Sequence, residues 1–302
     1  MRVLVLGSSA GGGFPQWNCN CRNCRGVREG TLNAKPRTQS SIAVSADSES
    51  WVLINASPDI LAQLKANPVL QPARRIRDTG IAGIILVDSQ IDHTTGLFML
   101  REGAPLQVYS TASVREDLTS GNPIFKVLAS YCTVEWHQVR TGESFSVAGV
   151  ERLSFVAIPV PSKAPPFSPH RERPRPDDNI GLLVRDAASG GTLFYAPGLA
   201  EIDEGIGSAM RLADCLMVDG TCWTDDEMIR MGAGHKRAIE MGHLAQSGEN
   251  GMIAQLRRFP GPRKILIHIN NTNPILDEDS AERAQLEREG IEVAYDGMEV
   301  TL

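Results

Sequence analysis

The sequence has no excess of positive charge and no long apolar run. Among its 302 residues, 30 lysines and arginines are set against 36 aspartates and glutamates, which gives a formal net charge of -6. Because Lys and Arg contacts to phosphate dominate nonspecific affinity for nucleic acid, we expect no nucleic-acid partner. No apolar segment approaches the length of a membrane helix, so we expect no membrane partner. Residues 1–3 enter an apolar segment without a signal peptide, which favours the cytoplasm.

A dinucleotide-binding motif is also missing. Residues 7–13, GSSAGGG, follow a short apolar strand predicted at 3–6, but they lack the G-x-G-x-x-G spacing. Phe14 and Pro15 stand where the helix of such a motif would begin. We interpret the glycines instead as backbone that passes close to another element of the fold.

Cysteines are few, and half of them are clustered. Cys19, Cys21 and Cys24 form C-x-C-x-x-C within six positions of a chain that has six cysteines in all. A reducing compartment disfavours disulfides, and this spacing lets three thiolates converge on one ion. Four protein ligands around zinc make a structural site, so we expect a structural zinc whose fourth donor comes from elsewhere in the chain. The alternative is three unligated cysteines, or one disulfide and an odd thiol.

Apolar strands alternate with helical segments along the whole chain, which predicts an α/β fold. The two halves show the same mixture without a linker between them, so we expect one domain over 1–302 with helices outside two sheets. Residues 159–176 break the pattern, because they hold seven prolines together with several basic side chains. They predict a long exposed loop. This loop is either a lid over a carboxylate-rich substrate, with Arg171, Arg173 and Arg175 binding it, or a solvated insertion.

A buried strand predicted at 84–87 ends abruptly in polar side chains, and a helix is expected from 94 to 101. Asp92 and His93 are adjacent there and suit zinc, manganese or iron as a ligand pair. The alternative is that Asp92 caps the helix and His93 is a core residue. Such an edge of an open α/β sheet is where sites usually lie.

Three further polar residues stand at or near later strand ends. Asp219 follows the apolar segment 215–218, His268 lies within the apolar segment 265–269, and His243 follows a glycine between two predicted helices. Each histidine taken alone is more often structural than functional. Their recurrence beside strand ends favours a common site with Asp92 and His93, holding two carboxylates and three imidazoles.

Three motifs carry a resemblance that extends along the whole chain. They are FPQWNCNCRNC at 14–24, VDSQIDHTTGL at 87–97 and IHINNTNP at 267–274. With these the chain resembles the metallo-β-lactamase superfamily, and more closely the coenzyme PQQ synthesis protein B family. The resemblance implies an αββα sandwich of the metallo-β-lactamase type.

The superfamily's metal-binding pattern is only partly present. Of H-x-H-x-D-H, Asp92 and His93 match, whereas Asp88 and Gln90 occupy the two leading histidine positions. A later histidine position falls near Ser162 and a bridging aspartate position near Pro197, while His268 keeps the last histidine. His243, in Met-Gly-His, is similar to the Gly-His turn that places a histidine beside the metals in tRNA-processing relatives.

These departures make a two-metal hydrolase doubtful, because two ions need more ligands. Two histidines and a carboxylate suit a single iron(II), so we expect Asp92, His93 and His268 as its ligands. His243 and Asp219 would then act as acid, base or orienting groups. The resemblance implies hydroxylation, with oxygen, of the tyrosine-derived ring of a small peptide-derived substrate in pyrroloquinoline quinone (PQQ) biosynthesis. Other proteins of that pathway are candidate partners. The alternatives are a noncatalytic carrier of PQQ or its precursor, or a metallohydrolase.

The fourth ligand of the structural zinc has two candidates. His268 is chemically preferred, but it would then be lost to the catalytic metal. The resemblance implies the other choice, because relatives with this cysteine cluster take a ligand a few residues after their active-site histidine. That position is Asn271 in this chain.

Overall fold

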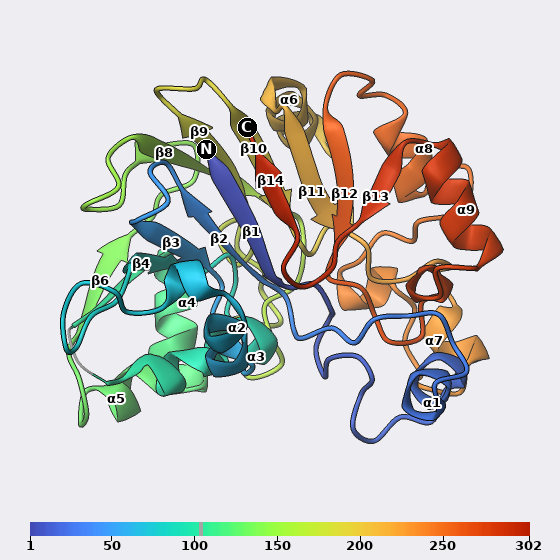
Figure 1. Cartoon of the computed structure of the whole chain (residues 1–302), viewed down its shortest axis with the longest axis horizontal. Helices are drawn as coiled ribbons and strands as arrows, with labels where there is room; N and C mark the ends of the chain where they lie inside the picture. Colours follow the sequence, from blue (N-terminus) through green and yellow to red (C-terminus); the bar gives the residue numbers. More distant parts are fainter. Residues whose placement is uncertain (103–104) are drawn as a thin grey trace.

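The computed structural model describes residues 1–102 and 105–302, and two mixed β-sheets pack face to face at its centre (Figure 1). The first sheet has the order β14-β1-β2-β3-β4-β5-β6 and the second β13-β12-β11-β10-β9-β8-β7. Strands of the first sheet are β1 (Arg2–Gly7), β2 (Ser41–Ser45), β3 (Trp51–Ile54), β4 (Ile81–Ile85), β5 (Leu106–Ser110), β6 (Val134–Gln138) and β14 (Glu299–Thr301). Strands of the second are β7 (Ser144–Phe145), β8 (Leu153–Pro159), β9 (Ile180–Asp186), β10 (Thr192–Ala196), β11 (Cys215–Asp219), β12 (Arg263–Ile267) and β13 (Ile291–Val293).

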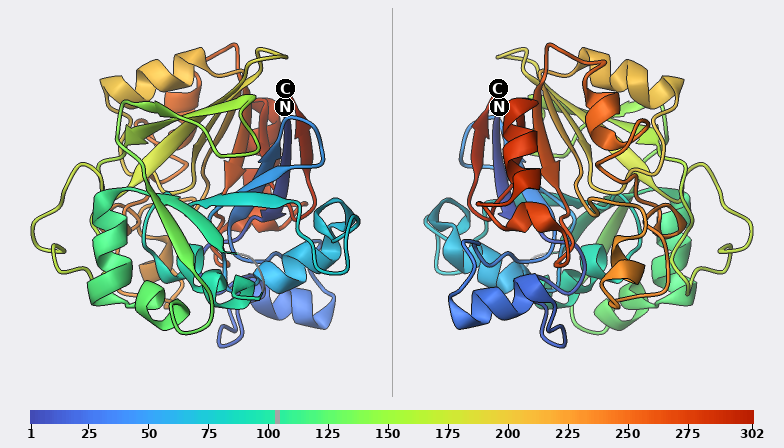
Figure 2. Two further views of the ribbon diagram at one scale, coloured as in Figure 1. Left: turned by 90° about the vertical axis from the view of Figure 1, so that its left-hand side faces the viewer. Right: turned by 90° about the vertical axis from the view of Figure 1, so that its right-hand side faces the viewer.

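Helices cover the outer faces of both sheets (Figure 2). Those on the side of the first sheet are α2 (Ile60–Ala66), α3 (Ile91–Thr94), α4 (Ala112–Glu116) and α5 (Ile124–Leu128), with the short turns η1 (Pro68–Leu70), η2 (Thr95–Leu100) and η3 (Asp117–Gly121). Those on the side of the second are α6 (Glu204–Leu212), α8 (Met252–Leu256) and α9 (Ala281–Arg288), with η5 (Pro274–Leu276). Beyond the strand ends lie α1 (Arg22–Glu29), α7 (Glu227–Arg230) and η4 (Ile239–Met241).

The core explains why the strands read as unbroken apolar runs. In β1, Val3 and Val5 point between the sheets while Leu4 and Leu6 point toward the helices on the outer face. Both sets are buried, so a strand with a layer on each side needs apolar residues at every position. The αββα sandwich is therefore confirmed. The single domain stays a prediction, which the apolar core shared by both sheets supports.

The polar segment after β4 differs from its expected form. Leu86 and Val87 continue beyond the strand, but the helix expected at 94–101 is replaced by the single turn α3 and the 3-10 turn η2. Gly96 explains the tight approach here, since a β-carbon at this position would lie 2.2 Å from the carbonyl oxygen of Ser57. The chain is thus pressed against the loop that follows β3.

The loop 159–176 has no helix or strand after Pro159, as expected, but it is anchored rather than free. His170 is buried between two carboxylates, with its Nε2 3.3 Å from Asp117 and its Nδ1 2.9 Å from Asp178. Arg171 donates to the carbonyl oxygen of Ala164, and Arg175 pairs with an exposed glutamate, Glu116. These two arginines are therefore engaged by the protein itself.

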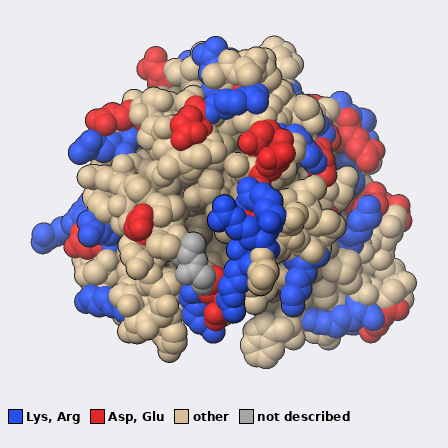
Figure 3. Space-filling view, turned by 60° about the vertical axis from the view of Figure 1, so that its left-hand side comes forward, with Lys and Arg blue, Asp and Glu red and all other residues tan. Residues whose placement is uncertain are grey.

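The charged side chains on the face drawn in Figure 3 are interspersed. Lys and Arg side chains lie among Asp, Glu and uncharged residues there, without one unbroken basic surface. Among the helices that the structure describes, none combines the length and the apolar character that crossing a membrane requires.

Candidate functional site

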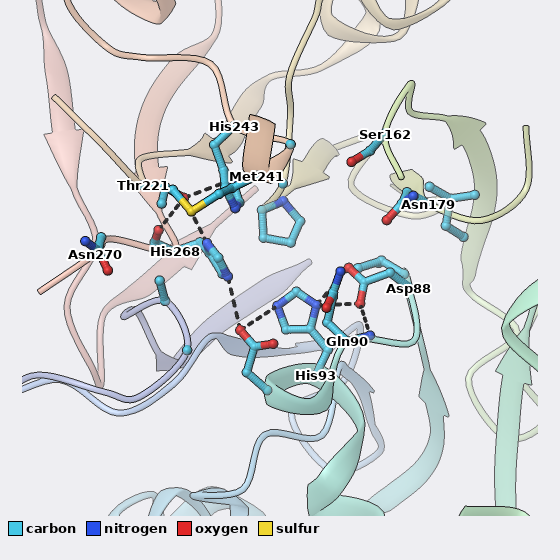
Figure 4. A pocket seen from close by; sticks show the side chains of 18 of the residues that line it. Asp88, Gln90, His93, Ser162, Asn179, Thr221, Met241, His243, His268 and Asn270 are labelled. Carbon is cyan, nitrogen blue, oxygen red and sulfur yellow. Dashed lines mark hydrogen bonds and ion pairs between the residues drawn. The ribbon is translucent and has the colours of Figure 1, made fainter. Parts of the chain in front are cut away.

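A cavity of about 230 Å³ lies where the ends of β4, β11 and β12 meet (Figure 4). The side chains of Asp92, His93, His243 and His268 all line it. The sequence placed these four near strand ends, and the fold brings them to one edge, as the topology of α/β sheets predicts.

Three donor atoms converge on one side of the cavity. Asp92 Oδ2 lies 3.4 Å from His268 Nε2 and 4.0 Å from His93 Nε2, and ligand atoms of the three residues lie within 4.8 Å of one another. Asp92 does not cap α3, because Gln90 occupies the cap position and makes no side-chain cap hydrogen bond. The alternative reading of Asp92 as a helix cap is therefore wrong.

Hydrogen bonds fix which ring nitrogen of each histidine faces the cavity. Both oxygens of Asp88 lie 2.8 Å from His93 Nδ1, and the Oγ1 of Thr221 lies 2.9 Å from His268 Nδ1. His93 Nε2 is buried without a hydrogen-bond partner in the described part of the chain. A buried ring nitrogen without a partner, opposite a carboxylate-bound one, is the arrangement of a metal-ligating histidine. The donor set thus fits a metal ion.

His243 stands beside this set and is positioned by Asp219. Its Nδ1 lies 2.7 Å from Asp219 Oδ2, and its ring stacks on that of His268 with centroids 5.2 Å apart. Asp219 is fully buried and accepts further hydrogen bonds from the Leu199 amide and from Thr221. Of the three roles expected for Asp219, these contacts support the orienting one.

Charges inside the cluster shift several pKa values. Burial alone would raise the pKa of Asp92, but His93 and His268 hold it well below its usual range. Burial opposes the charge on His93, yet Asp88 and Asp92 raise its pKa to about 9. Burial likewise opposes the charge on His243, whose pKa Asp219 raises, whereas burial lowers the pKa of His268. The carboxylates therefore compensate for positive charge at this edge.

The backbone is specialised around these residues. A β-carbon on Gly11 would lie 3.2 Å from Asp92 Oδ2, so the glycine-rich segment 7–13 passes directly beside the carboxylate, as its composition predicts. His268 has φ of 61°, a left-handed conformation that non-glycine residues seldom adopt. Residues held this way concentrate at functional sites.

The cysteine cluster forms a second candidate metal site. The sulfurs of Cys19, Cys21 and Cys24 lie within 4.8 Å of one another, and the Cys21 side chain caps α1. Backbone amides of Gln16 and Cys24 lie 3.4 and 3.5 Å from the sulfurs of Cys24 and Cys21. Such amides stabilise thiolates, so the cluster fits zinc. The side-chain nitrogen of Asn271 donates to Cys24 Sγ at 3.3 Å, while His268 lies with Asp92. Asn271, and not His268, therefore lies beside the cysteine cluster, and its side-chain oxygen is the atom that would have to bind the zinc.

Sequence reasoning gave no role to four residues around the cavity. Asp88 and Thr221 orient histidines, and Ser162 and Asn179 line the opposite wall. Asp88 and Ser162 carried a signal, because both stand at or near positions where the superfamily pattern has a histidine, whereas Thr221 and Asn179 carried none. Conversely, no Lys or Arg is among the described residues that line the cavity, so the arginines of loop 159–176 do not reach it.

Comparison with protein families matches residues 50–269 to the model described as "Beta-lactamase superfamily domain". Proteins named "Coenzyme PQQ synthesis protein B" match over their full length and that of this chain. The one from Nitrosococcus oceani is 59% identical over 309 residues, and the one from Pseudomonas paraeruginosa is 60% identical over 304 residues.

Solved structures give the same picture. The crystal structure of "Zn(2+)-bound PqqB from Methylobacterium extorquens" superposes with a TM-score of 0.92 at 40% identity, with all of both chains covered. A diphosphatase from the PhnP family has a TM-score of 0.67 at 20% identity, covering 99% of this chain and 97% of its own. At that identity the second likeness concerns the fold alone.

Proposed function

The chain belongs to the coenzyme PQQ synthesis protein B family of the beta-lactamase superfamily, and from this premise we propose that it is an iron- and oxygen-dependent hydroxylase of PQQ biosynthesis. Its substrate is the tyrosine-derived ring of a small product of the precursor peptide. One oxygen atom of O₂ enters a ring C–H bond, and the other leaves as water with two protons and two electrons from an external reductant.

The donor set is the observation that carries this proposal. Asp92, His93 and His268 offer one carboxylate and two imidazoles, and all three line the cavity. This ligand set would suit non-haem iron(II) and would leave coordination positions open for oxygen and substrate. The Methylobacterium relative is described as zinc-bound, which supports metal binding by this chain. Zinc would also suit the cluster of Cys19, Cys21 and Cys24.

Hydrolysis by two metals has less support. Gln90, Ser162 and Pro197 stand at positions where the superfamily pattern has two histidines and a bridging aspartate, and all three line the cavity. Neutral amide, hydroxyl and proline side chains are poor ligands for a second divalent ion. The half of the cavity that these residues line is therefore available to substrate.

The side chains around the proposed metal position have different roles in catalysis. Asp88 and Thr221 hold His93 and His268 with Nε2 toward the cavity, and Asp92 supplies the anionic donor. When bound there, iron(II) supplies the electron-transfer chemistry through which O₂ reacts with an organic substrate. His243 shares its Nδ1 proton with Asp219, and its raised pKa suits it to hold a second proton at Nε2 as a general acid of the site.

Oxygen labelling tests the proposal. The protein is loaded with iron(II) without air, given a tyrosine-containing cross-linked peptide and a reductant, and exposed to ¹⁸O₂. We expect a mass gain from one ¹⁸O in the wild type and none in Asp92→Asn, because asparagine lacks the ligand charge. Binding of the peptide without oxygen uptake would instead favour a carrier. A fully active Asp92→Asn with normal iron content would overturn the ligand assignment.

A further inference from the structure

The base of loop 159–176 forms one wall of the cavity. The amide of Val160 donates to the carbonyl oxygen of Asn179 at 2.9 Å, and the amide of Ile180 donates to the carbonyl oxygen of Val87 at 2.9 Å. These two bonds tie both ends of the loop to each other and to the end of the first sheet. Ser162 and Asn179 thereby face the space across from His93 and His268 (Figure 4).

The position of this wall is tightly determined. A β-carbon on Gly242 would lie 2.5 Å from the Ser162 hydroxyl, so Ser162 packs against the turn that carries His243. Gly242 also has φ of 94°, a conformation that favours glycine. Asp178, which precedes Asn179, is fixed by His170 and by the amide of Arg175, to which it lies at 2.7 Å. The wall is therefore part of the rigid site.

One polar atom of this wall lacks a partner. The Nδ2 of Asn179 makes no hydrogen bond among residues 1–102 and 105–302, and neighbouring atoms close it off from the cavity, although the side chain itself lines the cavity. A buried amide without a partner is unfavourable, so rotation of this side chain toward a polar group of the substrate would satisfy it. The carboxylates nearby are already engaged, since Asp88 binds His93 and Asp92 lies between two imidazoles.

The surroundings define the chemistry of that group. The cavity walls that the structure describes contain no Lys or Arg to neutralise a carboxylate, while Ser162, Asn179 and Gln90 are neutral. Met228 and Met241 line the cavity together with apolar side chains, and thioethers pack well against aromatic rings. About 230 Å³ holds one ring and not a whole peptide, given that sites for drug-sized ligands start at about 300 Å³.

We propose that Ser162 and Asn179 determine specificity by binding the hydroxyl of a phenol-type ring that lies against Met228 and Met241. That the ring becomes hydroxylated rests on the proposed function, but its selection does not. The two side chains hold the ring through its neutral O–H group, with the metal ligands opposite. An otherwise equal ring without the hydroxyl leaves both polar groups unpaired and is rejected.

Binding to the zinc-loaded protein separates selection from turnover, because zinc has no redox chemistry. Isothermal titration with N-acetyl-tyrosine amide and N-acetyl-phenylalanine amide compares two neutral ligands that differ by one hydroxyl. We expect the wild type to prefer the tyrosine amide about tenfold or more, as one hydrogen bond to a buried group implies. Asn179→Leu keeps the bulk of the side chain without its amide and should reduce the ratio to near one. Ser162→Ala should reduce it in part.

Arg173→Ala, on the exposed part of the same loop, is the matched control and should keep the wild-type ratio. Zinc content and thermal melting of each variant show whether the site is intact, and Asn179→Ala replaces Asn179→Leu if the latter does not fold. Equal binding of both amides by the wild type, no binding of either, or a wild-type ratio in Asn179→Leu would each overturn the proposal. Failure of ¹⁸O incorporation by the iron form would overturn the hydroxylase and leave the selectivity measured with zinc standing.

Discussion

Replacement of Asp88 by asparagine should weaken metal binding at the active site although Asp88 is no ligand itself. Both of its oxygens lie 2.8 Å from His93 Nδ1, so the carboxylate holds the proton on Nδ1 and leaves Nε2 for the metal. Asparagine keeps the shape but removes the charge, and its NH₂ group can face the ring and stabilise the wrong tautomer. Loss of such a partner weakens metal affinity about 10- to 100-fold, which equals about 1.4 to 2.7 kcal/mol.

The assay is competition for metal between the protein and a chromophoric chelator, after the cysteine cluster has been filled with zinc. Asp203→Asn is the matched control, because Asp203 caps α6 and asparagine caps a helix about equally well. We expect this control to bind like the wild type. Affinity of Asp88→Asn within threefold of the wild type, with melting unchanged, would refute the idea that Asp88 sets the tautomer of His93.

Three other predictions concern stability. Cys21→Ser should lose one zinc per chain by elemental analysis and several kcal/mol of stability; unchanged zinc content would contradict a structural site. His170→Ala should cost about 3 to 5 kcal/mol in urea denaturation, because Asp117 and Asp178 would stay buried without their partner; a loss under 1 kcal/mol would count against this. Burial raises the pKa of Glu227 from 4.5 to about 7, so its proton is kept longer in the folded state. Stability should therefore fall as pH rises from about 4.5 to 7, by at most about 3 kcal/mol, and Glu227→Gln should flatten that slope; an equal slope in both proteins would exclude Glu227 as the cause.

The fold was predictable because both sheets are covered on each face. Runs such as 3–6 and 215–218 are apolar at every position, since alternate side chains enter different cores. The close approach of residues 7–13 to another element could also be predicted, because such an approach of the backbone to a neighbour requires glycine. Helix formation after β4 was harder to predict. Tertiary contact between Gly96 and the loop after β3 replaces the expected helix by two short turns.

The sequence pattern identified the individual site residues at strand ends, but it did not show which role each residue has. Asp219 and Asp92 both follow or adjoin buried strands, yet one is a fully buried support and the other faces the cavity. The hydrogen bonds that Asp219 accepts from Leu199 and Thr221 help to distinguish its position from that of Asp92. Asn179 follows a proline-rich loop with no local pattern of its own. Its role depends on a contact between β8 and β9 that composition does not reveal.

The loss of a second metal and the gain of a substrate wall are, on this proposal, one structural change. The two-metal pattern that the sequence resembles has ligands at the positions of Gln90, Ser162 and Pro197, and in this chain these three residues line one cavity. On this proposal, an organic ring occupies the part of the cavity that a second ion and its ligands would otherwise fill. Asp88 stands at a position where the superfamily pattern has a histidine, and here its carboxylate contacts Nδ1 of His93, on the side of the ring opposite Nε2. A Gln90→His substitution alone should therefore narrow the cavity without creating a second metal site, because the ligands at the positions of Asp88, Ser162 and Pro197 would still be missing.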